Sequence, residues 1–591
     1  MTLSRKPLQI VEIDLPRCTR TYATAPCTAA LGTTGDHKCY NSIATCQDVP
    51  NFLSANLTLR FSKNQSGLPR GQAIYPALSN VTTRAGRVNL SGIDPKRSPL
   101  GQRARITVTL QDFTDAEAYI DKYQAERISG AAQSSGIGYR PKDRGTFFAK
   151  LKKRWPYYLG KPLRVLEGYE GDALASMRTR SYVITEWSGP NAAGKVTITA
   201  KDVLDLADNN KAQAPVASRG KLLADISASA TTLTLTPSGI GSEYSASGYV
   251  AIGREVMAFT RSSDTLTVTR AQFDTTASAH STSDVVQECL IYTKQRADVI
   301  IADLLTTYAG IDPAFIDTAA WFAESERWLG GIVFGAIITK PEGVAGLIGE
   351  ICQHGIMVWW DEVAQEIRFK LNRPLDLDEV FLQVTDDRNI IEGTADIEDA
   401  VDERASQVHF WHGIIDPTGS VTDGSNFKKL VIGSDLTLEG DDFYGESRIK
   451  EIFSRWFGTS GDDATASVIV DRLIARYKFV PENFTCDLDA KDLSGVGMTS
   501  LVEVSTRLLT DDTGIIEPRQ MQVLFREETQ PGSRFRIEAQ TFPQSARFGY
   551  IMADSSNDYS SATASEISRG CYIANESTLV FSDGTGPYLI F

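Results

Sequence analysis

The sequence predicts a mainly β (α+β) protein of several antiparallel β-barrel or sandwich domains, with a few amphipathic helices and one inserted small β-module. Three observations predict this fold class. The chain has 591 residues, which is too many for one hydrophobic core. Runs of alternating apolar and polar residues, typical of half-buried strands, outnumber helical patterns. Clusters of Gly, Pro, Asn and Asp separate neighbouring runs, as they do in β-hairpins.

Strand patterns are clearest in five stretches. They are residues 8–14, 104–113, 180–187 and 195–202, and IMVWWDEVAQEIRFKL at 356–371, which is typical of a hairpin. The intervening stretch GPNAAGKVT, residues 189–197, is close to the phosphate-binding loop G-x4-G-K-[ST]. However, Val196 stands where that loop needs a hydroxyl group, and a strand pattern follows instead of a helix. We therefore interpret it as a hairpin turn.

Helical patterns are few. Residues 297–309 and 341–355 carry apolar side chains at intervals of three and four, and glycines stand at Gly310 and Gly355. We expect each helix to cover one face of a sheet.

Changes in composition divide the chain into six predicted regions. Residues 223–288 differ most, because they are rich in Ser and Thr, poor in Lys and built from short strand patterns. The regions are 1–60 (N-terminal strand and cysteine loop), 61–222 (first β-domain), 223–288 (inserted module), 289–375 (helix and hairpin), 376–548 (second β-rich domain) and 549–591 (linker and C-terminal β-element).

The charge balance limits the classes of partner. With 60 Lys and Arg against 74 Asp and Glu, the net charge is −14, which argues against broad binding of phosphate backbones. An acidic wall would instead keep passing DNA from adhering. The N-terminal stretch has no signal-peptide pattern and no long apolar span follows. We therefore expect synthesis in the cytosol, where cysteines stay reduced.

Half of the eight cysteines lie in one short polar stretch, CTRTYATAPCTAALGTTGDHKCYNSIATC. Their spacing is C-x8-C-x11-C-x6-C, formed by Cys18, Cys27, Cys39 and Cys46. A loop of this kind can wrap its thiolates around a common centre, so we expect a metal site. Four thiolates suit either tetrahedral zinc or an iron–sulfur cluster, and His37 is a possible competing ligand. The spacing leaves these alternatives open.

The same stretch resembles the iron–sulfur segment of tail-tip proteins in long-tailed bacteriophages of the lambda type. The resemblance implies that Cys18, Cys27, Cys39 and Cys46 hold a [4Fe–4S] cluster. The segment is N-terminal here and C-terminal in the lambda-type proteins. Because the chain carries few other motifs of catalytic sites, we expect the cluster to have a structural role rather than a redox role.

Further stretches resemble hub or distal-tail proteins of siphophages and gene-transfer agents. They are PLGQRARITVTLQDF, GKPLRVLEGYEGD, the 356–371 hairpin and the module's GYVAIGREVMAF. The resemblance implies a tail-tip or baseplate hub in the virion, a homotrimer that closes the distal end of the tail tube. The implied partners are the distal tail protein, the tape measure protein and tail fibre or receptor-binding proteins. DNA would pass only after the hub opens, without sequence-specific binding.

Catalytic signatures are sparse, so we expect a protein that is not an enzyme. The stretch HFWH, with His409 and His412, follows a strand pattern that points the two rings to opposite faces. The basic and aromatic stretch at 150–161 is interpreted as a helix end followed by core aromatics. Cys289, Cys352, Cys486 and Cys571 are interpreted as structural.

Two alternatives from another class stay open. One is an iron–sulfur enzyme or electron carrier, although the ferredoxin spacings are missing. The other is a zinc-containing cell-wall hydrolase, which is supported only by scattered Asp and Glu residues that could act as paired carboxylates.

Overall fold

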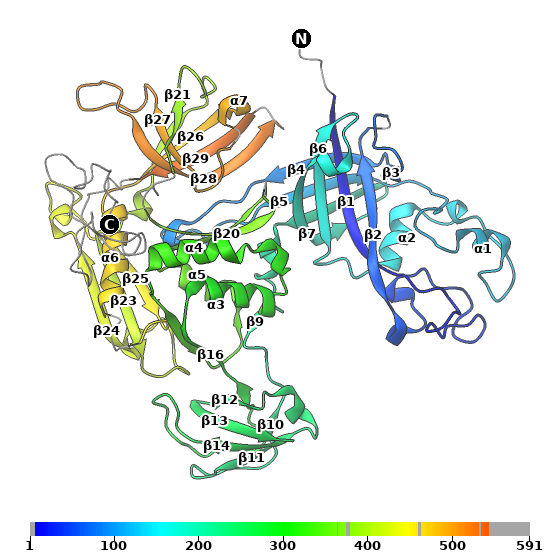
Figure 1. Cartoon of the computed structure of the whole chain (residues 1–591), viewed down its shortest axis with the longest axis horizontal. Helices are drawn as coiled ribbons and strands as arrows, with labels where there is room; N and C mark the ends of the chain where they lie inside the picture. The colour runs from blue at the N-terminus through cyan, green and yellow to red at the C-terminus, as the bar shows by residue number, and fades with distance from the viewer. Residues whose placement is uncertain are drawn as a thin grey trace, which may run out of the picture. The chain divides into compact units, whose positions relative to one another are not determined.

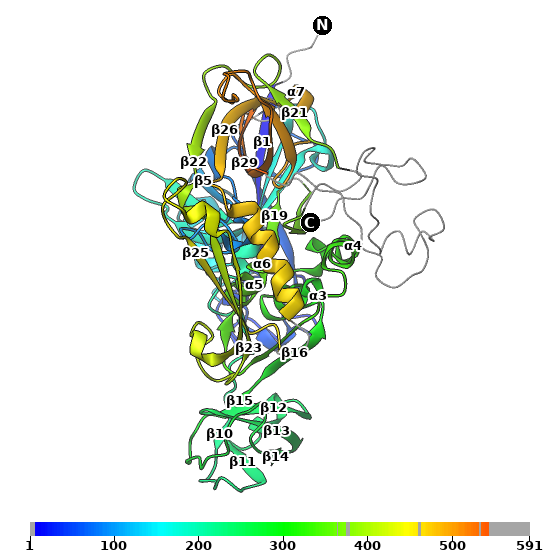
Figure 2. The same ribbon diagram turned by 90° about the vertical axis from the view of Figure 1, so that its left-hand side faces the viewer.

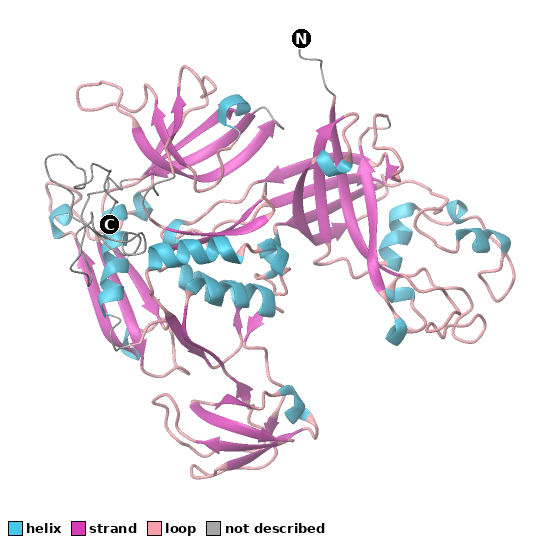
Figure 3. Ribbon diagram, viewed as in Figure 1, coloured by secondary structure: helices cyan, strands magenta, loops and turns pink. Residues whose placement is uncertain are grey.

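The computed structural model describes residues 6–64, 66–362, 364–373, 379–458, 463–493, 495–530 and 534–542. Within these residues strands dominate and helices are few (Figure 3), which confirms the predicted fold class. The chain divides into two compact units. Unit 1 comprises Met1–Ala85, Arg103–Asp205 and Trp360–Gln365, and unit 2 comprises Gly86–Gln102, Leu206–Trp359 and Glu366–Phe591.

Unit 1 is built on an eight-stranded sheet with the order β3-β2-β1-β6-β7-β8-β5-β4 (Figure 1). Its strands are β1 (Pro7–Cys18), β2 (Ser54–Ser62), β3 (Ile74–Tyr75), β4 (Leu78–Arg84), β5 (Arg105–Gln111), β6 (Pro162–Tyr169), β7 (Arg178–Ser188) and β8 (Lys195–Lys201). All neighbours pair antiparallel except β2 and β3. Two helices accompany the sheet, α1 (Gln124–Ser129) and α2 (Phe147–Arg154).

The two faces of β1 have different neighbours. Val11, Ile13 and Leu15 lie in the main core of unit 1, on which α2 packs with buried phenylalanines. On the other face, Glu12 and Asp14 are buried and both accept hydrogen bonds from Arg164, at 2.9 and 2.7 Å. Such cross-strand charge pairs favour one register. The position of Cys18 at the end of β1 therefore follows from the pairing of the whole strand.

A six-stranded sheet with the order β10-β11-β14-β13-β12-β15 has its own apolar core. Its strands are β10 (Lys221–Leu222), β11 (Thr232–Thr236), β12 (Ser247–Ile252), β13 (Glu255–Ser262), β14 (Thr265–Thr269) and β15 (Gln287–Glu288). An isolated bridge between Lys221 and Val285 links the two ends of this sheet.

Three strand pairs and three helices are formed by the residues that precede and follow this sheet in the sequence. The pairs are β9 (Gln213–Ala214) with β18 (Glu342–Gly343), β16 (Leu290–Gln295) with β17 (Phe334–Ile338), and β19 (Ile356–Asp361) with β20 (Glu366–Leu371). The helices are α3 (Ala297–Asp303), which continues as a π-helix over Leu304–Tyr308, α4 (Thr318–Leu329) and α5 (Val344–Cys352).

The C-terminal part of unit 2 holds two further sheets. One has the order β21-β27-β28-β29-β26-β22 and the other β24-β23-β25. Helix α6 (Asp463–Tyr477) packs on β24 and β23 (Figure 2). The bounds are β21 (Leu382–Thr385), β22 (Asp396–Asp399), β23 (Gln407–Ile414), β24 (Phe427–Ser434), β25 (Ile449–Ser454), β26 (Glu482–Asp489), α7 (Ala490–Leu493), β27 (Leu501–Ser505), β28 (Arg519–Gln530) and β29 (Arg534–Thr541).

Several local expectations are confirmed. The stretch 189–197 joins β7 to β8 as a hairpin turn, in which the side chain of Asn191 accepts hydrogen bonds from two backbone N–H groups. The prediction of core aromatics at 150–161 is confirmed only in part. Trp155 follows α2 and is buried, with its indole N–H donating to the carbonyl of Pro16 at 2.7 Å, whereas Tyr157 is exposed. His412 is fully buried on β23, whereas His409 is half-buried.

Two features predicted from the sequence lie beyond the last residue that the structure describes. The linker and C-terminal element at 549–591 and Cys571 lie outside the described residues.

Among the helices that the structure describes, none has both the length and the apolar character needed to cross a membrane.

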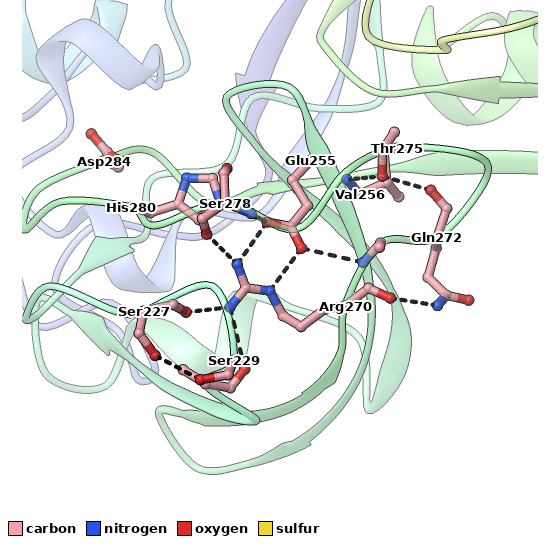
Figure 4. A network of polar contacts seen from close by, with 12 residues as sticks. Ser227, Ser229, Glu255, Val256, Arg270, Gln272, Thr275, Ser278, His280 and Asp284 are labelled. Atoms are coloured by element: carbon pink, nitrogen blue, oxygen red, sulfur yellow. Dashed lines mark hydrogen bonds and ion pairs between the residues drawn. The ribbon is translucent and has the colours of Figure 1, made fainter.

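A buried carboxylate holds the turns of the β10–β15 sheet together (Figure 4). Glu255 is fully buried and accepts two hydrogen bonds from Arg270, at 2.7 and 2.6 Å. It also accepts from the backbone N–H of Ser278 at 3.0 Å, and Nε2 of His280 lies 2.9 Å away. Burial raises the pKa of Glu255, but these hydrogen bonds outweigh burial and lower the pKa to about 2.

This lowered pKa predicts acid lability of the β10–β15 sheet. Because the pKa of Glu255 is lower in the folded than in the unfolded state, its contribution is complete above about pH 5. It is lost as the pH falls towards 2, a change on the order of 3 kcal/mol in the free energy of unfolding. Hydrogen-exchange protection of β11–β14 in the full chain measures this loss.

The matched variants are Glu255→Gln and Glu243→Gln. Glu255→Gln leaves Arg270 buried without its carboxylate, so protection falls by about 3–5 kcal/mol and its acid dependence flattens. Glu243 forms an exposed ion pair with Arg219, and its replacement leaves protection unchanged. Equal acid profiles in both variants contradict this assignment.

Candidate metal centre

The four cysteines of the N-terminal stretch line one cavity. Cys18 ends β1, and the loop 19–53 carries Cys27, Cys39 and Cys46 before the chain returns as β2. All four thiols are free. The structure thus brings together the four residues that the sequence singled out. It leaves His37 exposed and outside the cavity lining.

The cavity is small, about 10 Å³, which is room for one water molecule. A coordinated metal ion lies about 2.3 Å from a thiolate sulfur, much closer than a water molecule does. The space that the four thiols offer to a metal ion is therefore larger than the volume they leave for water. Within the described residues, no group of three or more His, Cys, Asp or Glu side chains is gathered tightly enough to hold a single metal ion.

Asn41 ties the middle of the loop to the end of β1. The backbone N–H of Cys18 donates to the carbonyl of Asn41 at 2.7 Å, and the Asn41 amide donates to the carbonyl of Cys18 at 3.3 Å. Asn41 is buried and has a φ of 57°. Asparagine tolerates this left-handed conformation better than most residues.

The outer part of the loop is held by Asp48 and Gln47. Asp48 accepts a hydrogen bond from the backbone N–H of Thr28 at 2.7 Å, and this bond lowers its pKa. Gln47 donates to the carbonyl of His37 and accepts from the hydroxyl of Tyr22, at 2.7 and 2.8 Å. These contacts bring the segments that carry Cys27 and Cys46 together.

The electrostatics of the cavity oppose bare thiolates. Burial raises the pKa of the Cys39 thiol, and the charges of the other three cysteines raise it further. Burial also raises the pKa of Cys46. Four neighbouring thiolates need positive charge among them, which a bound metal provides.

The apolar content of the site is small. Its core consists of Tyr22, Ala29, Cys39 and Tyr123, against which Cys27 and Leu31 pack. One candidate ligand, Cys39, is therefore itself a core residue, and Cys27 packs against this core. Since so few apolar groups are buried here, metal coordination can supply folding energy that the loop otherwise lacks.

A second segment, far along the chain, supports the loop. We call residues 121–139 the platform. Figure 1 shows the loop below the end of β1 beside α1, which lies in this segment. An isolated bridge pairs His37 with Gln133, and the N–H of Lys38 donates to the carbonyl of Ala132 at 2.9 Å.

The platform itself is compact. Gly130 ends α1 with a φ of 90°, and a Cβ at this position would collide with the carbonyl of Gly136. Sequence reasoning missed the platform because about eighty residues separate it from the cysteines. The sequence carries no short-range pattern that pairs this segment with the cysteine loop.

Comparisons with known proteins give no family assignment. No protein-family model and no curated protein matches this chain. Similar solved structures include a tail protein from Neisseria meningitidis MC58, with 10% identity, a TM-score of 0.35 and coverage of 78% of this chain and 95% of that one. A 43 kDa tail protein of prophage MuSo2 from Shewanella oneidensis has 11% identity, a TM-score of 0.34 and coverage of 79% and 99%.

A third similar structure is the Francisella PdpA–VgrG complex, with 10% identity, a TM-score of 0.31 and coverage of 100% of this chain and 62% of that one. At such TM-scores the likenesses do not establish a common fold. The site and the function are therefore argued from this chain's own residues.

Replacing Asn41 tests how the loop is held. Asn41→Gly removes the side-chain hydrogen bonds but suits a positive φ, and it lowers protection of the loop amides by about 1 kcal/mol. Asn41→Ala also strains the backbone, which costs about 1 kcal/mol more. Hydrogen exchange of peptides covering 18–46 measures both. Wild-type protection in Asn41→Ala contradicts this role.

Proposed function

We propose that this chain is a structural protein of a phage-like tail tip, a baseplate hub that closes the distal end of the tail tube as a homotrimer. One observation carries the proposal. The N-terminal segment that resembles the iron–sulfur segment of lambda-type tail-tip proteins folds so that Cys18, Cys27, Cys39 and Cys46 line a common cavity. The hub would join the distal tail ring to fibre or receptor-binding proteins.

We further propose that the four cysteines hold a structural [4Fe–4S] cluster, with zinc as the alternative. The donor set of four free thiols fits both. When bound, the cluster would supply four covalent ties between the end of β1 and its loop.

The architecture supports a mechanical role. The eight-stranded sheet and the two six-stranded sheets have separate apolar cores, formed by different parts of the chain. Separate cores allow domains to move as units when their contacts are released. The net charge of −14 would keep DNA from adhering during exit, since DNA is repelled by an acidic surface.

The location in the particle is tested by labelling. An antibody against this chain, viewed by electron microscopy on assembled particles, should mark the tip of the tail distal to the capsid. Label on the capsid or along the tail shaft, or a chain absent from purified particles, contradicts the hub assignment. A chain that stays monomeric in assembled particles contradicts the trimer.

The metal is tested by elemental analysis of anaerobically purified protein. We expect about four irons and matching sulfide per chain, lost when any of Cys18, Cys27, Cys39 or Cys46 is replaced by serine. Cys289→Ser is the matched control, because Cys289 is a free cysteine outside the cavity. Stoichiometric zinc in a colourless wild-type protein rejects the cluster and favours the alternative.

A further inference from the structure

The four cysteines differ in how firmly the protein holds them. Cys18 and Cys39 are nearly buried, with exposed fractions of 9% and 8%, whereas Cys27 and Cys46 are half-buried. Cys18 belongs to β1, and its register is set by pairing with β2. Cys39 belongs to the loop, so its position needs a separate explanation.

Arg127 provides that explanation. This platform residue is fully buried and donates to the carbonyls of Lys38 and Cys39, at 3.1 and 3.0 Å. Its Nε donates to Asp121 at 2.6 Å. The guanidinium therefore stays charged, and its hydrogen bonds to the loop are charge-assisted.

Tyr40, the residue after Cys39, is clamped between two cations. The guanidinium carbons of Arg127 and Arg154 lie 3.7 and 3.8 Å from the centre of its ring. Its hydroxyl lies 2.8 Å from that of Tyr139. Stacking of this kind stabilises desolvated Arg–aromatic pairs by about 2 kcal/mol. The main chain on both sides of Cys39 is thus fixed by buried, charged contacts.

We propose that Arg127 is a positioning residue that orders Cys39 beside Cys18 before the metal group binds, so that Cys27 and Cys46 close the site afterwards. The proposal rests on the proposed metal site. It adds an order of events: an inner pair is preformed by the fold, and an outer pair completes the site. A preformed pair reduces the ordering cost that binding must offset.

The test uses the full chain, reduced and stripped of metal, and follows alkylation of each cysteine by iodoacetamide with mass spectrometry. In the wild type, Cys27 and Cys46 should react about tenfold or more faster than Cys18 and Cys39, because accessibility limits buried thiols. Arg127→Met should speed the alkylation of Cys39 about tenfold or more, because it removes both charge-assisted hydrogen bonds from Arg127 to the loop.

Arg180→Met is the matched control. Arg180 is also a buried arginine of unit 1, and it pairs with Glu167 away from the cysteine loop. Its loss should leave the alkylation rate of Cys39 within about twofold of the wild-type rate, the range expected for distant independent sites.

If Arg127→Met does not fold, a second pair of variants tests the proposal. Tyr40→Leu removes the stacked ring, and Tyr40→Phe is its conservative control. We expect fast alkylation of Cys39 in Tyr40→Leu and wild-type behaviour in Tyr40→Phe.

Two outcomes overturn the proposal. One is an unchanged rate at Cys39 in Arg127→Met or Tyr40→Leu relative to the controls. The other is a wild-type Cys39 that reacts as fast as Cys27. Metal content is measured separately on the same preparations before stripping. A wild type that binds neither iron nor zinc rejects the proposed metal site, whereas the alkylation pattern alone decides whether Arg127 positions Cys39.

Discussion

The pairing of β1 with both of its neighbours is the constraint on which the cysteine site depends. β1 lies inside the sheet of unit 1 and pairs with β2 over nine residues, from Ile10 with Ser62 to Cys18 with Ser54. A shift by one residue would move its apolar side chains out of the core and separate Glu12 and Asp14 from Arg164. Both ends of the loop 19–53 are therefore fixed, and Cys18 is placed by the packing of an entire domain.

The loop itself is stabilised in a different way from the sheet. It buries few apolar side chains, and polar contacts replace them: the turn at Asn41, the Asp48 and Gln47 hydrogen bonds and the contacts of Arg127. Buried charged hydrogen bonds are specific in geometry but costly when one partner is missing. Such a loop has a defined shape and little surplus stability, a combination in which a bound metal has a large effect on folding.

The fold class and the local hairpins were predictable because they follow from short-range patterns. The alternation of β1, the turn at 189–197 and the helix α5 all lie within a few residues of their signals. The four cysteines were recognisable for the same reason. The platform was not, because Asp121 and Arg127 reach Cys39 only through the folded sheet, and nothing in QAERISG marks an arginine that will be fully buried. The proposed domain boundaries stay predictions, and the nature of the metal does not follow from spacing.

The central claim is that the sequence from Cys18 to Cys46 is organised around a metal group that shapes a loop in a structural protein. Anomalous X-ray scattering from crystals grown without oxygen tests this claim most directly. We predict a strong anomalous peak at the iron absorption edge, enclosed by the four sulfur atoms of Cys18, Cys27, Cys39 and Cys46. A peak only at the zinc edge would contradict the cluster, and the absence of any peak between these sulfurs would contradict the metal centre itself.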